Sequence, residues 1–324
     1  MKLTIGTRGS QLALVQAEYV AATLRQHHPG LEVALQIITT TGDRVLDVAL
    51  SKVGDKGLFV KEIEVALLDG EVDLAVHSCK DMPSLTPDGL LLAAFPERAT
   101  PYDALVLPHL DDSDAPLLND PASNPLDLLP TGATVGTSSL RRTAQLRALR
   151  PDLHIRDVRG NVGTRLNKLD SGDYDALILA AAGLERLGMH ERVSAYLLPA
   201  VMLPAVAQGI LAIETRAADA QTRHLLQPLD HPASRVAALA ERALLRRLEG
   251  GCQVPMAAHA ELETDGQHVH LRGLVSSLDG QRVVRGEQRG PADAAETLGT
   301  ELAEYLLAQG AGAILSEQRG ASVP

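Results

Sequence analysis

The first part of the chain alternates short apolar runs with stretches in which apolar residues recur at helical spacing. The runs are of strand length, and the helical stretches between them begin near Leu58 and after Ser10, which is expected to be the N-cap of its helix. Strands buried on both faces read as continuous apolar runs, whereas an amphipathic helix repeats its apolar positions every three or four residues. This order predicts an α/β unit in which helices cover both faces of a mostly parallel sheet. Its expected strands are 3–5, 31–38, 74–76 and 90–95.

The same alternation returns in a second unit after a linker bounded by Pro96 and Pro101. The expected strands are 103–107, 133–136, 154–158 and 174–180, with helices over 140–150 and 162–169. Between them, His109 to Pro130 is rich in Asp, Pro, Asn and Ser and is expected to be an exposed loop without chemistry. A further apolar strand, 210–214, is placed to cross back to the first unit. We therefore expect two lobes with a ligand cleft between them.

From Asp230 onward the pattern changes: a stretch with clear helical periodicity is followed by strand-like runs that are separated by residues typical of turns. The helix spans 233–249, and Gly250-Gly251 is expected to supply its left-handed cap. Three strand candidates follow at 257–262, 268–276 and 282–288, joined by turns that contain Asp-Gly. A last helix is expected over 292–307, and the tail after Gly310 is expected to fray. The third unit is thus predicted to be a small α+β domain whose three-stranded antiparallel sheet is covered by helices.

The composition of the chain argues against several classes of function. The chain has 324 residues, a net charge of -11, 2% aromatic residues and no Trp, which argues against a nucleic-acid binder because such proteins need basic surfaces and stacking platforms. Two cysteines fit a reducing cytoplasm. The N-terminal residues lack the apolar core of a signal peptide, and no apolar stretch is long enough to span a membrane. Metal-ligand spacing is absent from the sequence, so no metal is expected.

Against this acidic background, one segment is basic. Residues 138–165 contain seven arginines and two aspartates. A solvated helix face accounts for Arg147 and Arg150. Arg141 and Arg142 instead follow the expected Ser138-Ser139 cap at the start of a helix, where cations oppose the helix dipole unless an anion lies among them. We infer a polyanionic ligand held at converging strand ends by Arg8, Arg141, Arg142, Arg159 and Arg165; because no phosphate-binding motif is present, carboxylates are as suitable as phosphates.

Two further stretches are candidates for chemistry. The strand at 74–76 ends in a polar cluster with Lys80 and Asp81, and α/β proteins place ligands at such carboxyl ends of strands. Cys252 follows two glycines and precedes Pro255. A lone cysteine is often an inert buried side chain, but a thiol presented from a tight loop can also serve as an attachment point. The residues alone leave both interpretations of Cys252 open.

Six segments together resemble the porphobilinogen deaminase (hydroxymethylbilane synthase) family, and the resemblance covers essentially the whole chain. They are TRGSQLA at 7–13, KVGDKGLF at 52–59, HSCKDMP at 77–83, GTSSLRR at 136–142, RGNVGTR at 159–165 and GGCQVP at 250–255. Each segment alone is weakly specific, but their order and spacing together are specific.

The resemblance implies the fold, the domains and the cofactor. The fold would be two α/β domains similar to type II periplasmic binding proteins, plus a small α+β domain with a three-stranded antiparallel sheet. Domain 1 would comprise 1–96 and 203–222, domain 2 would comprise 101–200, and domain 3 would comprise 229–324. A dipyrromethane cofactor would be attached to Cys252 by a thioether.

The resemblance also implies roles for individual residues. Asp81 would be the catalytic carboxylate, which stabilises the azafulvenium cation formed when the substrate loses ammonia. Lys56 and Phe59 would lie on a mobile loop over the cleft. The carboxylates of cofactor and growing chain would be bound by Arg8, Ser10, Lys52, Ser78, Lys80, Ser138, Ser139, Arg141, Arg142, Arg159, Arg165, Arg186 and Gln208.

The implied reaction joins four porphobilinogen molecules into a linear tetrapyrrole, in tetrapyrrole (haem and porphyrin) biosynthesis. The enzyme would be a cytoplasmic monomer without nucleic-acid or membrane partners, and its product would pass to the next enzyme of the pathway. Cys79 and Ala207 depart from the family pattern, which has an apolar residue such as Met and a Gly at these positions. Two rival functions are a non-enzymatic anion-binding module and a nucleic-acid binder; Asp81 and Cys252 argue against the former, and the acidic charge argues against the latter.

Overall fold

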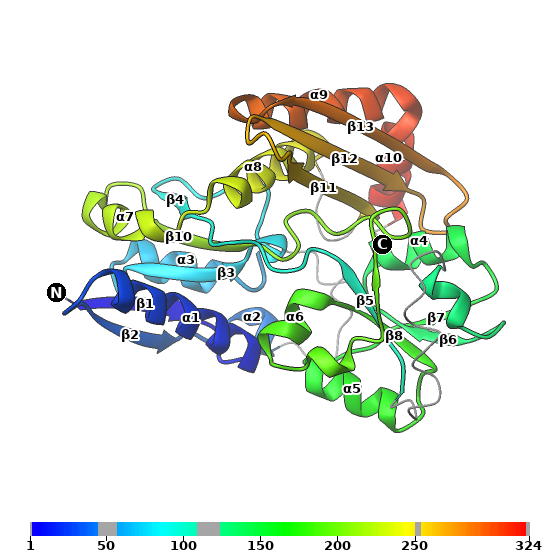
Figure 1. The fold of residues 1–324 in the computed structure, drawn as a ribbon, viewed down its shortest axis with the longest axis horizontal. Helices are drawn as coiled ribbons and strands as arrows, with labels where there is room; N and C mark the ends of the chain where they lie inside the picture. Colours follow the sequence, from blue (N-terminus) through cyan, green and yellow to red (C-terminus); the bar gives the residue numbers. More distant parts are fainter. Residues whose placement is uncertain (1, 45–56, 109–123, 250–253, 322–324) are drawn as a thin grey trace.

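The computed structural model describes residues 2–44, 57–108, 124–249 and 254–321. Their strands form two five-stranded sheets and one three-stranded sheet, each with its own helices. In Figure 1 the first sheet consists of blue and cyan strands together with residues 211–216 in yellow-green, the second sheet lies in the green part, and the third lies in the orange part above them.

The first sheet has the order β2-β1-β3-β10-β4. Its strands are β1 (Lys2–Thr7), β2 (Glu32–Ile37), β3 (Leu74–Ser78), β4 (Leu90–Ala94) and β10 (Leu211–Arg216). Helices α1 (Gln11–His27) and α7 (Ala220–Leu226) pack on one face. Helix α3 (Lys61–Leu68) packs on the other face, and the short α2 (Thr41–Arg44) precedes it. The prediction of helices on both faces is therefore confirmed.

The second sheet repeats this plan with the order β7-β6-β8-β5-β9. Its strands are β5 (Asp103–Val106), β6 (Thr134–Gly136), β7 (His154–Arg156), β8 (Ala176–Ala180) and β9 (Ala195–Leu197). Helix α4 (Leu140–Leu149) covers one face, and α5 (Val162–Asp170) and α6 (Ala181–Arg186) cover the other.

Both large sheets are mixed, but in each sheet four of the five strands run in one direction, which agrees with the expectation of a mostly parallel sheet. In the first sheet β1 runs parallel to β2 and β3, whereas β10 runs antiparallel to β3 and β4. In the second, β5 takes the same antiparallel place beside β8. The reason is the path of the chain: β5 and β10 are the first strands after each crossing between the lobes, and each enters its sheet against the direction of its neighbours.

The third unit contains β11 (Met256–Leu262), β12 (His268–Ser276) and β13 (Val283–Pro291), which pair antiparallel as expected. Helices α8 (Pro232–Arg247) and α9 (Ala295–Leu306) pack against this sheet (Figure 1). The chain does not fray after Gly310, which has a φ of 98°; it continues as α10 (Gly312–Ala321). The fraying prediction is wrong because Ile314 and Leu315 are buried in the core of this unit.

Two further local expectations need correction. The left-handed residue after α8 is Glu249, with a φ of 50°, whereas Gly250 and Gly251 lie outside the described residues. Within the segment from His109 to Pro130, residues 109–123 are also outside them. The rest of that segment is exposed only in part: Asp127 and Pro130 are exposed, whereas Leu126 and Leu129 are buried at a 3-10 turn, because their apolar side chains complete the core under β6.

Candidate functional site

Strand ends from both lobes carry the predicted site residues. Arg8 follows β1 and Lys80 follows β3, and these two strands are parallel neighbours in the first sheet. In the second sheet, α4 follows β6 and Arg159 follows the neighbouring β7. Because parallel neighbours end at the same edge, each lobe gathers its polar residues at one edge of its sheet.

The polar cluster after β3 forms a single 3-10 turn, Cys79–Asp81. Its start is fixed by a hydrogen bond from the Cys79 amide to the carbonyl of Ile210 (2.9 Å). The side chain of Cys79 points into the core, and burial raises the pKa of its thiol to about 11. Asp81 is exposed at the end of the turn, and its carboxylate has no hydrogen-bond or ion-pair partner among the residues that the structure describes.

Cations from both lobes surround Asp81. Burial lowers the pKa of Lys80 to about 8; Asp81 opposes this shift, and the charge of Arg142 adds to it. Burial likewise lowers the pKa of Arg165 to about 10, again with Arg142 and Arg159 adding to the shift and Asp81 opposing it. The structure therefore brings Lys80 of the first lobe within electrostatic reach of Arg142, and Asp81 within reach of Arg165, which in turn lies near Arg159. A group of cations that depress one another's pKa values favours an anionic ligand.

Arg141 and Arg142 are not free side chains in a cleft. Both are buried and bind Asp103, which has no exposed surface. Arg141 donates to it at 2.7 and 3.0 Å, and Arg142 at 3.0 and 2.8 Å. Burial alone would raise the pKa of Asp103, but the charges of both arginines outweigh it and hold that pKa below its usual range. Two cations share one carboxylate, so this buried cluster still carries net positive charge.

Gln208 belongs to the same cluster. Its amide nitrogen donates to Asp103 (3.0 Å) and to the carbonyl of Pro101 (2.8 Å), while its amide oxygen is buried without a hydrogen-bond partner in the described part of the chain. The preceding Ala207 has a φ of 58°, a left-handed conformation that favours glycine. The alanine that replaces the family's glycine is thus strained, and it lies beside the site, where the chain returns from the second lobe to the first.

Arg8 forms a separate contact group in the first lobe. Its Nε donates to Asp43 (3.1 Å), and its guanidinium carbon lies 4.2 Å from the centre of the Phe59 ring. Burial would raise the pKa of Asp43, but hydrogen bonds from Arg8 and Thr40 lower it overall. Among the described residues, the hydrogen bonds of the Arg8 side chain go to Asp43, and none joins Arg8 to the residues around Asp81. Phe59 is half-buried and packs on Arg8 in the turn before α3.

The four predicted serines all have structural partners. Ser10 and Ser139 cap α1 and α4 by accepting hydrogen bonds from Ala13 N and Arg142 N, as the sequence predicted. The Ser78 hydroxyl accepts a hydrogen bond from Gln16 (3.0 Å). The Ser138 hydroxyl donates to the carbonyl of Val158 (2.8 Å) and accepts from its amide (3.2 Å).

Arg186 lies near the crossing between the lobes. It donates to the carbonyl of Gly209 (2.6 Å), and burial lowers its pKa to about 10. Three other predicted residues, Lys52, Lys56 and Cys252, lie outside the described residues. The structure therefore gives no geometry for the predicted attachment cysteine, although it does describe α8, the helix that leads toward it.

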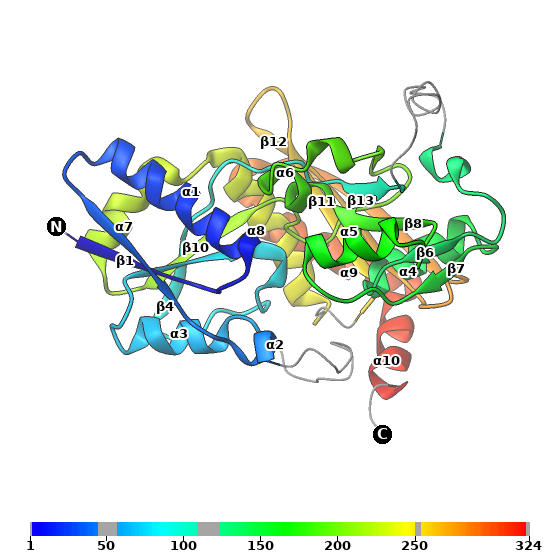
Figure 2. The ribbon, with the colours of Figure 1, turned by 90° about the horizontal axis from the view of Figure 1, so that it is seen from below.

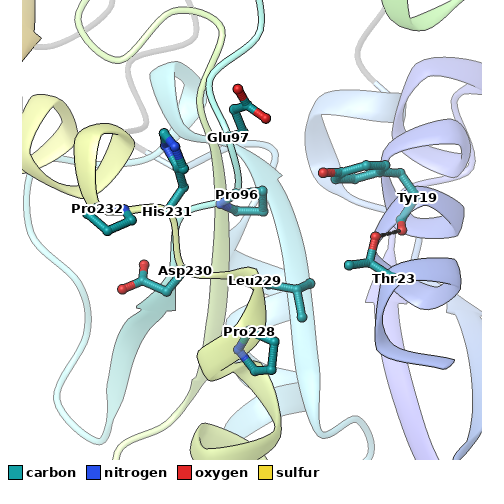
Figure 3. A pocket seen from close by; sticks show the side chains of 9 residues that line it. All are labelled: Tyr19, Thr23, Pro96, Glu97, Pro228, Leu229, Asp230, His231 and Pro232. Atoms are coloured by element: carbon teal, nitrogen blue, oxygen red, sulfur yellow. Dashed lines mark hydrogen bonds between the residues drawn. The ribbon is translucent and has the colours of Figure 1, made fainter. Parts of the chain in front are cut away.

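A pocket of about 240 Å³ lies away from this site (Figure 3). It opens between α1, the linker after β4 and the start of α8, and none of the predicted site residues lines it. Its walls are Tyr19, Thr23, Pro96, Glu97, Pro228, Leu229, Asp230, His231 and Pro232. Within the described ranges, no group of three or more His, Cys, Asp or Glu side chains could hold a metal ion. Nor does any described helix have the length and apolarity required to cross a membrane.

The sequence does not reveal the buried charged residues that bind the site residues and the segments next to them. Asp103 is one; another is Glu241 of α8, which binds Arg98 (2.7 Å) and the amide of Ala260 (2.7 Å). Arg242, beside it, donates to the carbonyl of Pro83 (2.9 Å), just after Asp81. An acidic residue inside the mostly apolar stretch 103–107 was the one available signal, since a buried charge requires a partner.

Two protein-family models match most of the chain. Residues 3–224 match the family described as "Porphobilinogen deaminase, dipyromethane cofactor binding domain", and residues 236–308 match "Porphobilinogen deaminase, C-terminal domain". Among solved structures, the BenM effector binding domain with benzoate is 15% identical, with 76% of this chain and 93% of that chain covered and a TM-score of 0.41. The periplasmic aliphatic sulphonate binding protein SsuA from Escherichia coli is 16% identical, with 76% and 70% covered and a TM-score of 0.39.

The fold has the expected architecture: two α/β domains, each with its own five-stranded sheet, and a small α+β domain with a three-stranded antiparallel sheet. The cation-rich strand ends suit a cofactor that carries carboxylates. The two family matches together span most of the chain, and so this protein belongs to the porphobilinogen deaminase family, the hydroxymethylbilane synthases, which are transferases of tetrapyrrole biosynthesis with a dipyrromethane cofactor.

Proposed function

We propose that the protein condenses four porphobilinogen molecules, one at a time, into hydroxymethylbilane, and that Asp81 is its catalytic carboxylate. The observation that carries this proposal is the position of Asp81: an exposed carboxylate at a strand end, within electrostatic reach of Lys80 and Arg165 from opposite lobes. A substrate with two carboxylates can bind the cations while its reacting carbon faces Asp81.

Each residue then has a distinct task. Loss of ammonia breaks a carbon–nitrogen bond and leaves a positive charge on the substrate, which a nearby carboxylate stabilises. Asp81 can also accept the pyrrole proton released when the new carbon–carbon bond forms. Lys80, Arg159 and Arg165 bind carboxylates directly, whereas Arg141 and Arg142, held by Asp103, act mainly through their charge.

The cofactor is proposed to be held by a thioether at Cys252. When bound, it supplies the pyrrole carbon to which the first substrate unit is joined. One described donor fits such a carboxylate-bearing group, because buried Arg141 Nε still lacks a hydrogen-bond acceptor within the described residues. Ser10, Ser78, Ser138, Ser139, Arg8, Arg186 and Lys52 are proposed to assist in binding, with Lys56 and Phe59 on the covering loop. We also propose that the enzyme acts as a cytoplasmic monomer whose product passes to the next enzyme of the pathway.

The test combines intact mass with turnover. Purified wild-type protein should be heavier than its chain by one dipyrrole, and Cys252→Ser should lack this excess. Asp81→Ala should fold normally but release almost no ammonia from porphobilinogen. The matched control is Asp88→Ala, an exposed aspartate in the loop that follows the turn. If the wild-type chain is unmodified, binds carboxylates and releases no ammonia, the anion-binding alternative replaces the enzyme.

A further inference from the structure

The turn that carries Asp81 is packed against the third domain. Cys79 and Met82, on either side of Asp81, are both buried in the same core cluster as Ala238 of α8. Since Cys79 and Met82 belong to the first lobe, this cluster joins the first lobe to the third domain. At its other end α8 leads to residues 250–253, where the predicted attachment cysteine lies outside the described residues.

Arg242 is the polar part of this contact. Its side chain comes from α8 and is 7% exposed. Its Nη2 donates to the carbonyl of Pro83 (2.9 Å) and lies 3.5 Å from that of Ser84. Its Nη1 is buried without a hydrogen-bond partner, and the guanidinium makes no ion pair with a carboxylate among the described residues.

A buried cation whose described neighbours are two carbonyl oxygens and the Cys79 thiol, with no carboxylate among the described residues, is costly for a protein to keep. If the position served packing alone, an apolar side chain would fill it without that cost. The guanidinium does something that an apolar side chain cannot: it holds two successive carbonyls of an otherwise irregular segment. The residues from Met82 to Gly89 form no helix or strand, and a backbone hydrogen bond from Met82 N to Cys79 O (3.2 Å) closes the turn from within.

The turn is thus fixed at two points. The first lobe holds its start through the bond from Cys79 N to Ile210 O (2.9 Å), and the third domain holds its end through Arg242. We propose that Arg242 is a positioning residue for catalysis, which fixes the Asp81 turn relative to α8 and hence to the end of α8 that leads to Cys252. This proposal rests on the proposed catalytic role of Asp81.

The first test compares two variants of the cofactor-loaded enzyme. Arg242→Met keeps the volume but removes the hydrogen bonds, and Arg246→Met is the control, because Arg246 lies on the same helix, is 43% exposed and pairs with Glu296. We expect Arg242→Met to lower kcat about 10- to 100-fold, since small displacements of a reacting group have costs of this size. KM should stay within about twofold and the melting temperature within about 4 °C. The control should leave kcat unchanged.

The second test reads the turn itself. In Arg242→Met, amide hydrogen exchange should become faster in peptides that cover residues 82–85 and stay unchanged in β3. Arg242→Lys can reach one carbonyl, so its kcat should fall between those of the wild type and Arg242→Met; it also serves as the test variant if Arg242→Met does not fold. Normal kcat in either folded variant, or unchanged exchange in the turn, would overturn the proposal.

A third comparison separates this inference from the proposed function. In an Asp81→Glu background, which keeps a carboxylate at the site, Arg242→Met should cause a smaller fold loss than in the wild type, because residues that act through one another are not additive. Equal fold losses in both backgrounds would contradict a role through Asp81. An active Asp81→Ala enzyme would instead refute the proposed function. If Asp81→Ala is inactive while Arg242→Met is normal, only the inference about Arg242 fails.

Discussion

Replacing Asp103 with asparagine tests whether one buried carboxylate holds the two arginines of the second lobe. Asp103 accepts hydrogen bonds from Arg141, Arg142 and Gln208, and has no exposed surface. Asparagine keeps the shape and one acceptor oxygen but removes the negative charge. Two guanidinium groups, 5% and 7% exposed, would then lie together without a counter-charge.

The expected loss follows from the cost of leaving a buried charge unpaired. Removing one partner of a buried ion pair costs about 3–5 kcal/mol. Because asparagine still accepts hydrogen bonds, the lower end applies, and we expect the second lobe to lose about 3 kcal/mol of stability. That loss corresponds to about a 100-fold faster exchange of its protected amides.

The effect depends on pH in a defined direction. The folded pKa of Asp103 lies below its unfolded value, which is about 4. Its contribution to stability is therefore fully present above about pH 4 and is lost as the pH falls toward the folded pKa. The difference between wild type and Asp103→Asn should be constant near neutral pH and shrink below about pH 4.

The assay is native-state hydrogen exchange followed by mass spectrometry of peptides from α4 and β8. Both elements contact the cluster, since Arg142 also donates to the carbonyl of Ile178 in β8 (2.8 Å). The control is Asp170→Asn in the same lobe, whose ion pair with Arg192 is partly exposed and should contribute less than about 1 kcal/mol. If Asp103→Asn exchanges no faster than the control, the two arginines do not depend on Asp103 and our account of the cluster is wrong.

Substitutions at three further positions test other features. Burial, followed by the charge of Glu214, raises the pKa of Glu64 from 4.5 to about 6, so the free energy of unfolding of the wild type should fall as the pH rises through about 6. In Glu64→Gln, the free energy of unfolding measured in urea should no longer fall in this way, and at pH 8 it should exceed that of the wild type by about 1–2 kcal/mol. Because the pKa of Lys80 is about 8, Lys80 loses its positive charge above that pH, and KM for porphobilinogen should rise. Lys80→Arg should move this rise to higher pH. If the dependence of KM on pH is the same in the variant, Lys80 does not bind a substrate carboxylate. Ala207→Gly should change stability by less than about 1 kcal/mol, since relief of the left-handed strain offsets the entropy of glycine, whereas Ala207→Val should lose about 2 kcal/mol in the same unfolding assay.

Features that depend on near neighbours in the chain could be predicted from the sequence. The apolar run at 74–76 identified β3, and Ser10 and Ser139 were recognised as helix caps because a cap bonds to an amide only a few residues away. The two Asp-Gly turns placed the strands of the third domain for the same reason.

Features that depend on distant partners could not. The sequence identified Arg141 as a site residue but could not show that it binds Asp103, 38 positions away. Arg242 looked like part of an ordinary amphipathic helix, and its partner carbonyl at Pro83 is 159 positions away. In each case the decisive fact is which group lies opposite a charge after folding, and local periodicity carries no information about it.

The antiparallel strand β10 has a consequence for how the protein is made. Strand β4 pairs with β10 at the edge of the first sheet, and β3 has β10 on one side. The ribosome completes β3 at Ser78 but does not complete β10 until Arg216, after the whole second lobe. At about 5–20 residues per second, the edge of β3 waits on the order of ten to thirty seconds for its partner. During that time the nascent first lobe exposes an unpaired apolar strand edge, so this interval is when we expect the chain to depend most on chaperones.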